Sequence, residues 1–280
     1  MSRNKSKILL QKARNLTSKD EEKAIEIYNN IIEMDGSWSV PYYNLGLIYK
    51  YNGQWQKSYE YNKKATELDA QDEAAYWNLG IACTVLKKWK EARIAWNQFG
   101  LDLDINEQEV DMNIGNTPIR LLNGEVVWGT RICPARAYID NIPFKESGHR
   151  YNDLILHDGS PNGKRILDGV EYSVFDELEI IEKSEYQTYS IGVEVESLED
   201  ITVLQDVCLD LDYGFENWTN SVRILCKQCS EGIPHEIHDK QLKRDTNEYN
   251  LAIATSTLEE LENVLEVWMQ TNEASVNWIE

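Results

Sequence analysis

Residues 42–69 read YYNLGLIYKYNGQWQKSYEYNKKATELD, and residues 76–104 read YWNLGIACTVLKKWKEARIAWNQFGLDLD. The two stretches share one framework, because a shift of 34 residues places identical, small or apolar residues on each other. The matched pairs are Leu45 with Leu79, Gly46 with Gly80, Trp55 with Trp89, Ser58 with Ala92, and Ala65 with Phe99. A repeat of this length predicts pairs of helices stacked into an array.

Apolar residues at the start of each copy recur at helical spacing. They are Tyr42, Leu45, Ile48 and Tyr49 in one copy, and Tyr76, Leu79, Ala82 and Cys83 in the next. Gly46 and Gly80 have no side chain, so we expect the second helix of each pair to approach closely there. Gly53 separates the two helices of the first copy, and Lys87 holds the equivalent position in the second.

A third, degenerate copy precedes these two. A step of 34 residues back from Ser58 reaches Ala24, inside DEEKAIEIYNNIIEMDG, and the first helix of this copy is expected over residues 5–15. Terminal repeats are usually atypical, because one of their faces meets water. The period, the Leu-Gly pair and the small residues resemble the tetratricopeptide repeat (TPR) family. The resemblance covers about the first third of the chain, and we recognise no family in the rest.

The resemblance implies that a ligand lies against the first helix of each pair. The residues at those positions are Tyr43, Asn44, Leu47, Lys50, Tyr51, Trp77, Asn78 and Ile81. Two interpretations remain: an aromatic-lined peptide groove, or aromatic side chains that only pack helix against helix. Asn62 stands where the family has a large apolar residue, and Ala70 where it has Pro. The positions lack a basic cluster, which argues against capture of an acidic peptide terminus.

The composition limits the possible partners. The 280 residues include 48 Asp and Glu but only 28 Lys and Arg, giving a formal charge of -20. Such a chain repels phosphate backbones, so we expect no nucleic-acid partner. The charge suits a soluble protein, or one with a basic partner.

Neither a membrane segment nor a disulfide framework is predicted. No apolar run approaches the roughly 20 residues that a membrane helix needs, and the first residues do not form a signal peptide. The five cysteines are odd in number and irregular in spacing. They do not suggest a disulfide framework, so we predict a reducing, cytoplasmic location.

Residues 112–185 are predicted to form a small all-β module. Turn pairs at residues 123–124, 158–159, 162–163 and 168–169 separate short strand-like runs. The expected strands are 118–122, 125–130, 136–142, 153–157, 164–167, 170–175 and 178–182. Short strands with frequent turns indicate a barrel, SH3-like or OB-like.

A charged loop at residues 145–151 reads KESGHRY. In a catalytic interpretation His149 is a base and Arg136 or Arg150 binds an anion, with Glu146 and His157 nearby. In the alternative, the loop is a solvated hairpin tied down by its own charges, or a contact surface.

Residues 186–280 contain two matching halves. Strand-like runs at 189–196 and 249–254 are each followed by a capping-box sequence, at 197–200 and 256–259, and then by a helical pattern. Further strands are expected at 221–227 and 274–279. This β-α-β-β-α-β order is that of a ferredoxin-like sandwich. The sequence thus predicts a multidomain protein: an all-α TPR array (1–111), an all-β module (112–185) and an α+β module (186–280).

A Cys/His insert interrupts the last module. Cys226, Cys229, His235 and His238 have the spacing C-x2-C-x5-H-x2-H. Thiolate and imidazole ligands suit tetrahedral zinc, and four protein ligands would close the site, so we expect a structural zinc ion. The alternative is a buried Cys226 with solvated histidines.

Three functions follow from these patterns. The first is a cytosolic scaffold or adaptor that binds a protein or peptide through its TPR array. The second is a metal-dependent enzyme that recruits its substrate through the repeats, although no zincin, phosphate-loop, nucleophile-elbow or Rossmann motif is present. The third is an acidic inhibitor of the immunity-protein type, with a basic partner.

Overall fold

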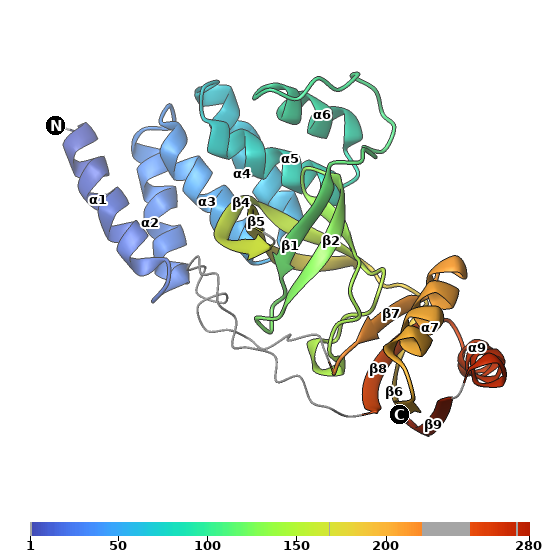
Figure 1. Ribbon diagram of the computed structural model, residues 1–280. Coiled ribbons are helices and arrows are strands. Elements are labelled where there is room, and N and C mark those ends of the chain that lie inside the picture. Colours follow the sequence, from blue (N-terminus) through green and yellow to red (C-terminus); the bar gives the residue numbers. More distant parts are fainter. Residues whose placement is uncertain (1, 168, 220–246, 273) are drawn as a thin grey trace. The chain divides into compact units, whose positions relative to one another are not determined.

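The computed structural model describes residues 2–167, 169–219, 247–272 and 274–280. Contacts divide the chain into two compact units, Met1–Asp111 and Met112–Glu280. Figure 1 shows helices in the first unit and both sheets in the second. No described helix is both long enough and apolar enough to span a bilayer.

The first unit is an array of antiparallel helix pairs. Its described helices are α1 (Ser2–Leu16), α2 (Glu21–Met34), α3 (Ser39–Tyr51), α4 (Trp55–Leu68), α5 (Glu73–Val85) and α6 (Trp89–Asn97). The predicted degenerate copy is therefore present as α1 and α2. The three residues 34 positions apart in the second helices, Ala24, Ser58 and Ala92, are all fully buried. The repeat that the sequence predicts is confirmed.

Close packing at the two repeat glycines explains their presence. A Cβ atom added to Gly46 would lie 2.5 Å from the side chain of Asn62, and one added to Gly80 would lie 2.5 Å from the ring of Trp96. Asn62 and Trp96 are themselves 34 residues apart. The two pairs therefore make the same contact with different side chains, and the unusual Asn62 fills a position that Trp96 fills in the next copy.

The turn between paired helices requires a left-handed residue. Gly53 has φ of +62°, and Lys87, at the equivalent position, has φ of +55°. Glycine adopts this conformation without steric cost, whereas lysine does so under strain.

The first half of the second unit is a β barrel. Its strands are β1 (Gly115–Arg120), β2 (Val126–Cys133), β3 (Arg136–Ile139), β4 (Leu154–Leu167) and β5 (Val170–Glu182), with a short 3-10 helix η1 (Lys145–Ser147) between β3 and β4. Neighbouring strands pair in antiparallel fashion, and β1 also pairs in parallel with β5, which closes the barrel. The β-rich character is confirmed, while the SH3-like or OB-like assignment stays a prediction.

Two of the predicted turns are wrong. The pairs at residues 158–159 and 162–163 lie inside β4, which continues through both, and the runs 170–175 and 178–182 form the single strand β5. The Asp-Gly and Asn-Gly pairs occur instead where the register between β4 and β5 shifts, between His157 and Lys164. A β-bulge uses the same permissive residues as a turn, so the sequence signal is the same.

The second half of this unit is a sheet with two helices. Its described elements are β6 (Gln187–Val195), α7 (Leu198–Asp210), β7 (Gly214–Asn217), β8 (Glu248–Thr255), α9 (Leu258–Thr271) and β9 (Ala274–Ile279). The strands lie in the order β7-β8-β6-β9, and every pairing is antiparallel. Side chains from α7 and α9 bury a common core with β6 and β8. The strand predicted at 221–227 lies outside the described residues.

Both predicted capping boxes are present, one of them shifted. Ser197 and Asp200 cap α7 as expected. At α9 the capping residue is Thr257, which pairs with Glu260, so this box begins one residue later than the sequence suggested.

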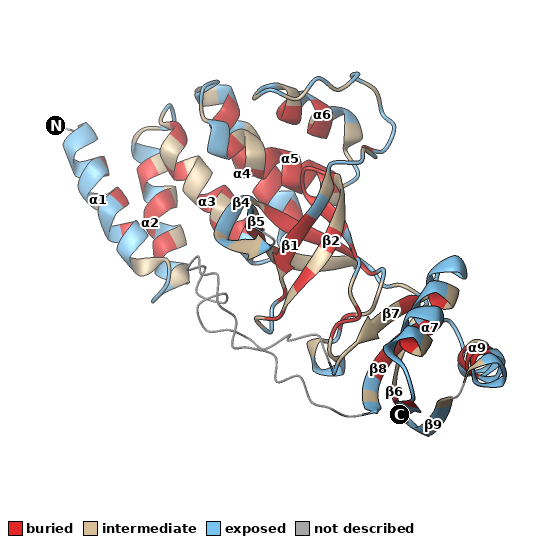
Figure 2. Cartoon of the chain, in the orientation of Figure 1, coloured by how far each residue is buried: buried red, intermediate tan, exposed pale blue. Residues whose placement is uncertain are grey.

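The barrel and the sheet share a small core within the second unit. Ile142, from the segment after β3, is buried with Ala252 and Ala254 of β8. Its backbone N–H also donates to a carboxylate oxygen of Glu216 at 3.1 Å. Figure 2 shows that burial is concentrated inside the barrel and on the inner sides of the helices, while α1 and α9 are largely exposed.

Candidate functional site

The residues predicted to contact a ligand lie on α3 and α5. We define the candidate binding face as Tyr43, Asn44, Leu47, Tyr51, Trp77, Asn78 and Ile81. Three of its residues on α3 correspond to three on α5 by the 34-residue period: Tyr43 to Trp77, Asn44 to Asn78, and Leu47 to Ile81. Tyr51 is 61% exposed, whereas Asn78 and Ile81 are buried.

The two asparagines of the candidate binding face already have partners in the chain. The Asn44 amide donates to the Val40 carbonyl at 2.7 Å, and its Oδ1 accepts from the Tyr28 hydroxyl at 3.3 Å. Oδ1 of Asn78 accepts a hydrogen bond from the Lys50 ammonium at 3.0 Å. The Asn44–Val40 bond lies within α3, whereas the bonds with Tyr28 and Lys50 join α3 to α2 and to α5, so part of the role of both asparagines is to hold the array together.

The aromatic residues of this face differ in their surroundings. The Trp77 ring packs against Trp96, with centroids 4.9 Å apart, which matches the packing interpretation for this residue. Tyr51, at the end of α3, is the most exposed aromatic of the face, and the Lys50 ammonium lies 4.5 Å from its ring centroid. Lys50 is itself buried, so this cation–π contact holds the Tyr51 ring in place and leaves the ring as the exposed part of the face.

The predicted zinc ligands are Cys226, Cys229, His235 and His238, which lie outside the described residues. In the rest of the chain, no three His, Cys, Asp or Glu side chains are grouped so that they could hold a metal ion.

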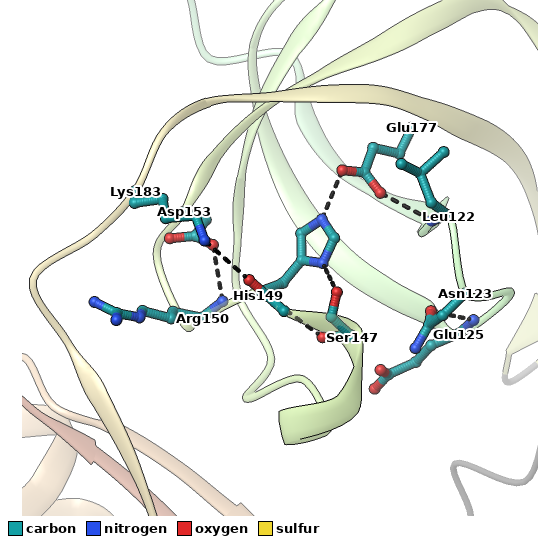
Figure 3. A network of polar contacts seen from close by, with 10 residues as sticks. Leu122, Asn123, Glu125, Ser147, His149, Arg150, Asp153, Glu177 and Lys183 are labelled. Atoms are coloured by element: carbon teal, nitrogen blue, oxygen red, sulfur yellow. Dashed lines mark hydrogen bonds and ion pairs between the residues drawn. The ribbon is translucent and has the colours of Figure 1, made fainter.

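The loop at residues 145–151 is anchored in the barrel by His149. This histidine is buried, and its Nε2 lies 2.6 Å from Oε1 of Glu177, which is also buried. Its Nδ1 lies 2.9 Å from the Ser147 carbonyl oxygen. The other carboxylate oxygen of Glu177 accepts from the backbone N–H of Leu122 at 2.9 Å. Figure 3 shows the imidazole between Glu177 and Ser147.

The contacts of His149 fix its protonation. A carbonyl oxygen can only accept, and an ionised carboxylate can only accept, so both ring nitrogens carry protons and the ring is cationic. Burial by itself lowers the pKa of His149, but the hydrogen bond and the charge of Glu177 outweigh burial, and the pKa is raised. A doubly protonated, buried imidazole has no free lone pair with which to act as a base. This favours the structural interpretation, in which ionic contacts within the chain hold the loop in place, over the catalytic one.

A second buried carboxylate completes the anchor. Asp153 accepts from the backbone N–H of Arg150 at 2.8 Å and from that of Ser184 at 2.7 Å. The Arg150 guanidinium donates to the Ser184 carbonyl, and Lys183 donates to the Gly148 carbonyl. Glu146 is exposed at the tip of the loop. The chain before β4 and the chain after β5 are therefore joined through one carboxylate.

The other two residues proposed for this site have different partners. His157 is fully buried in β4, donates through Nδ1 to the Asp158 carbonyl at 2.8 Å, and packs on the ring of Phe175. Burial, reinforced by the positive charge of Arg131, lowers the pKa of His157 to about 4, so this ring is neutral. Arg136 is buried, and its Nε donates to the Cys133 sulfur at 3.3 Å. The two histidines thus belong to different contact clusters and carry different charges.

Sequence reasoning missed Glu177 and Asp153, which decide the state of this loop. Glu177 falls between the two predicted strands 170–175 and 178–182, whereas in the structure it lies inside the single strand β5. A charged residue in a strand core is seldom buried without a partner, and the partner is separated from it by 28 residues.

Comparisons with known proteins give likenesses of fold. No family model matches the chain, and no curated protein matches it. The second TPR domain of Spaghetti (RPAP3), solved with an HSP90 peptide, is 23% identical over 35% of this chain and 93% of its own, with a TM-score of 0.33. The Arabidopsis OM64 TPR domain is 21% identical over 35% of this chain and 81% of its own, with a TM-score of 0.32. The N-terminal third of the chain is thus similar to TPR domains.

Proposed function

We propose that this protein binds a protein or peptide through the candidate binding face of its helical array. The observation that carries the proposal is the regular placement of large side chains on α3 and α5, with Tyr51 at 61% exposure. Exposed tyrosines supply much contact area at a low cost in conformational entropy, and they are enriched in binding surfaces.

The chemistry of this face favours a ligand with apolar side chains. The Lys50 ammonium already bonds Asn78 and lies over Tyr51, so it is part of the packing of the array. Asn44 and Asn78 are engaged inside the chain as well. We infer that the ligand is recognised through contact with tyrosine and leucine side chains more than through capture of a terminal carboxylate.

Affinity capture with paired variants tests the proposal. The double substitution Tyr43→Ala and Tyr51→Ala removes the aromatic surface of α3, and Tyr138→Ala removes an exposed tyrosine from the barrel as a matched control. We expect partners captured by the unmodified chain to be lost with the α3 variant and retained with the control. Capture that survives the α3 substitutions would exclude this face.

We further propose that the protein acts as a cytoplasmic scaffold, with the second unit providing additional surface. The described cysteines, Cys83, Cys133 and Cys208, are buried and unbridged, which agrees with a reducing compartment. The strand order β7-β8-β6-β9 is the one expected for a ferredoxin-like sandwich, and this supports that assignment. The loop around His149 supports a scaffold over an enzyme, since its ionisable groups are neutralised by internal partners.

The structural zinc ion is also a proposal, and it rests on the C-x2-C-x5-H-x2-H spacing. Elemental analysis of purified protein should find about one zinc per chain. The double variant Cys226→Ser and Cys229→Ser should contain none, while Cys83→Ser should keep its zinc. Equal metal contents in the two variants would contradict the assignment.

A further inference from the structure

The charge of the chain is distributed very unevenly. Residues 184–219 and 247–280 contain no lysine or arginine, while they carry nine and seven acidic residues respectively. Residues 1–19 show the opposite pattern, with six lysines and arginines and no acidic residue. The five lysines and arginines of the last module all lie in residues 220–246, outside the described residues, so the two described stretches carry acidic charge alone. Surfaces that only maintain solubility normally intersperse both signs.

The acidic residues form stripes on the two helices of the second sheet. On α7, Glu199, Asp206 and Asp210 are exposed and share a stripe with the exposed Val203. Carboxylates spaced four apart on a helix repel one another, as Asp206 and Asp210 must do here. A positively charged partner would relieve this repulsion.

The neighbouring helix α9 has the same character. Glu259, Glu262 and Glu266 are all exposed and follow one another at spacings of three and four residues. Val267, beside them, is 59% exposed. We call the exposed acidic and apolar residues of α7 and α9 the acidic helix face. Figure 2 shows the exposed outer sides of both helices.

Helix α1 presents a surface of matching chemistry. Lys5, Ile8 and Lys12 follow at spacings of three and four residues, so they lie on one side of the helix. Ile8 is 72% exposed, and both lysines are exposed. Ile8 and Lys12 also line a surface hollow with Leu16 and Lys19. A large apolar side chain flanked by lysines complements a surface of valines flanked by glutamates.

We propose that α1 of one copy of this chain docks on the acidic helix face of a second copy. The two surfaces are different parts of the chain, so the contact is heterologous and copies can add head to tail. Opposite charges bring the surfaces together, and the exposed apolar residues are covered on contact. This self-association is independent of the partner binding proposed for α3 and α5.

The test uses two charge-reversed variants of the full chain. The first variant carries Lys5→Glu and Lys12→Glu, which reverses the charge of the surface on α1. The second carries Glu262→Lys and Glu266→Lys, which reverses the charge of the acidic helix face on α9. All four residues are exposed, so both variants should fold. A third variant, Glu107→Lys and Asp111→Lys, makes the same charge change outside the acidic helix face.

Sedimentation or light scattering at low salt gives the readout. We expect the mass of the unmodified chain and of the third variant to rise with protein concentration, with an apparent Kd that increases about tenfold or more at high salt. Each of the first two variants alone should stay monomeric. Their equimolar mixture should associate again, because the intact α1 of one variant meets the intact acidic helix face of the other, and the two reversed surfaces also carry opposite charges.

Three results would overturn the proposal. The first is an unmodified chain that is monomeric at every concentration at low salt. In that case the acidic helix face would bind a different basic partner, or α1 of the same chain, and not a second copy. The second is self-association that persists in either reversed variant. The third is a mixture of the two variants that remains monomeric.

Discussion

The pair of His149 and Glu177 shows how a single buried contact determines the role of a loop. Both side chains are almost completely shielded from solvent and lie 2.6 Å apart, and each has a further hydrogen bond to the backbone. Two charges removed from water are tolerated only when each partner satisfies the other. Removal of one partner leaves an uncompensated charge in the barrel.

Glu177→Gln is therefore expected to destabilise the second unit by about 3–5 kcal/mol. Glu171 is a matched control, because it lies in the same strand and pairs with Lys164 at the same 2.6 Å distance, but both of those side chains are about half exposed. Glu171→Gln should cost less than about 1 kcal/mol. Urea unfolding of the three proteins measures the difference, and equal losses would contradict a buried ion pair.

His157 gives the barrel an acid-sensitive element. Its pKa is about 4 in the folded chain against the ordinary 6.5, so the folded state binds fewer protons than the unfolded state between these values. The stability it contributes is present above pH 6.5 and is lost as the pH falls toward 4, by about 3 kcal/mol in total. We expect the stability of His157→Gln, measured by urea unfolding from pH 7.5 to 4.5, to fall less steeply with acid than that of the unmodified chain. Parallel curves would show that His157 is already accessible to protons.

His149 has the opposite dependence. Its pKa is raised, so its contribution is complete below pH 6.5 and is lost as the pH rises through the folded value. The unmodified chain should therefore lose stability on the alkaline side relative to His149→Gln. A difference between the two proteins that does not change from pH 6 to 9 would contradict the cationic state of this ring.

At the scale of elements, the turns between paired helices test the repeat. Lys87 holds the left-handed conformation that Gly53 holds in the preceding copy. Lys87→Gly should raise the stability of the array by about 0.5–1 kcal/mol, because the relief of strain exceeds the added flexibility of glycine. Lys90→Gly, three residues later in the first turn of α6, should instead lower it, by at most about 1 kcal/mol. Thermal unfolding distinguishes these opposite signs, and a loss in both variants would refute strain at Lys87.

The sequence predicted helices and strands well where a pattern of neighbouring residues is enough to determine the element. The helix pairs follow from apolar spacing and from Gly46 and Gly80, whose Cβ positions the paired helix occupies. The predicted division of β4 and β5 is wrong, because Asp158 and Asn162 lie where the register between the two strands shifts and not in turns. A turn and a bulge need the same backbone freedom, and only the pairing partner distinguishes them.

At the scale of the whole molecule, the segment after the repeats is bound to the array. Arg93 is buried, and its guanidinium donates to the carbonyl oxygens of Asp104, Gln108 and Glu109. Hydrogen bonds from a charged donor are individually strong, so this one side chain orders the end of the first unit.

Arg93→Gln should therefore free the segment around residues 104–109. Cleavage by a glutamate-specific protease at Glu107 and Glu109 is expected to accelerate about tenfold or more, because local opening governs access to these bonds. Arg14→Gln, an exposed arginine in α1, serves as the control and should leave the rate unchanged. Equal rates for both variants would show that Arg93 does not order this segment.

The functional surfaces could be predicted only in part. The face on α3 and α5 follows from the 34-residue period, since equivalent positions must share a side of the array. The actual partners of Asn44, Asn78 and His149 come from other helices and strands, and no local pattern encodes such contacts. The resemblance to a family indicated where a ligand lies, while the contacts show that the asparagines also serve the fold.

The measurement that tests the central claim most directly is site-specific crosslinking from the full chain. A photoreactive amino acid in place of Tyr51 should form covalent adducts with the partner, and the same group in place of Tyr138 of the barrel should not. Adducts that form at position 138 and not at position 51 would contradict binding through the helical array.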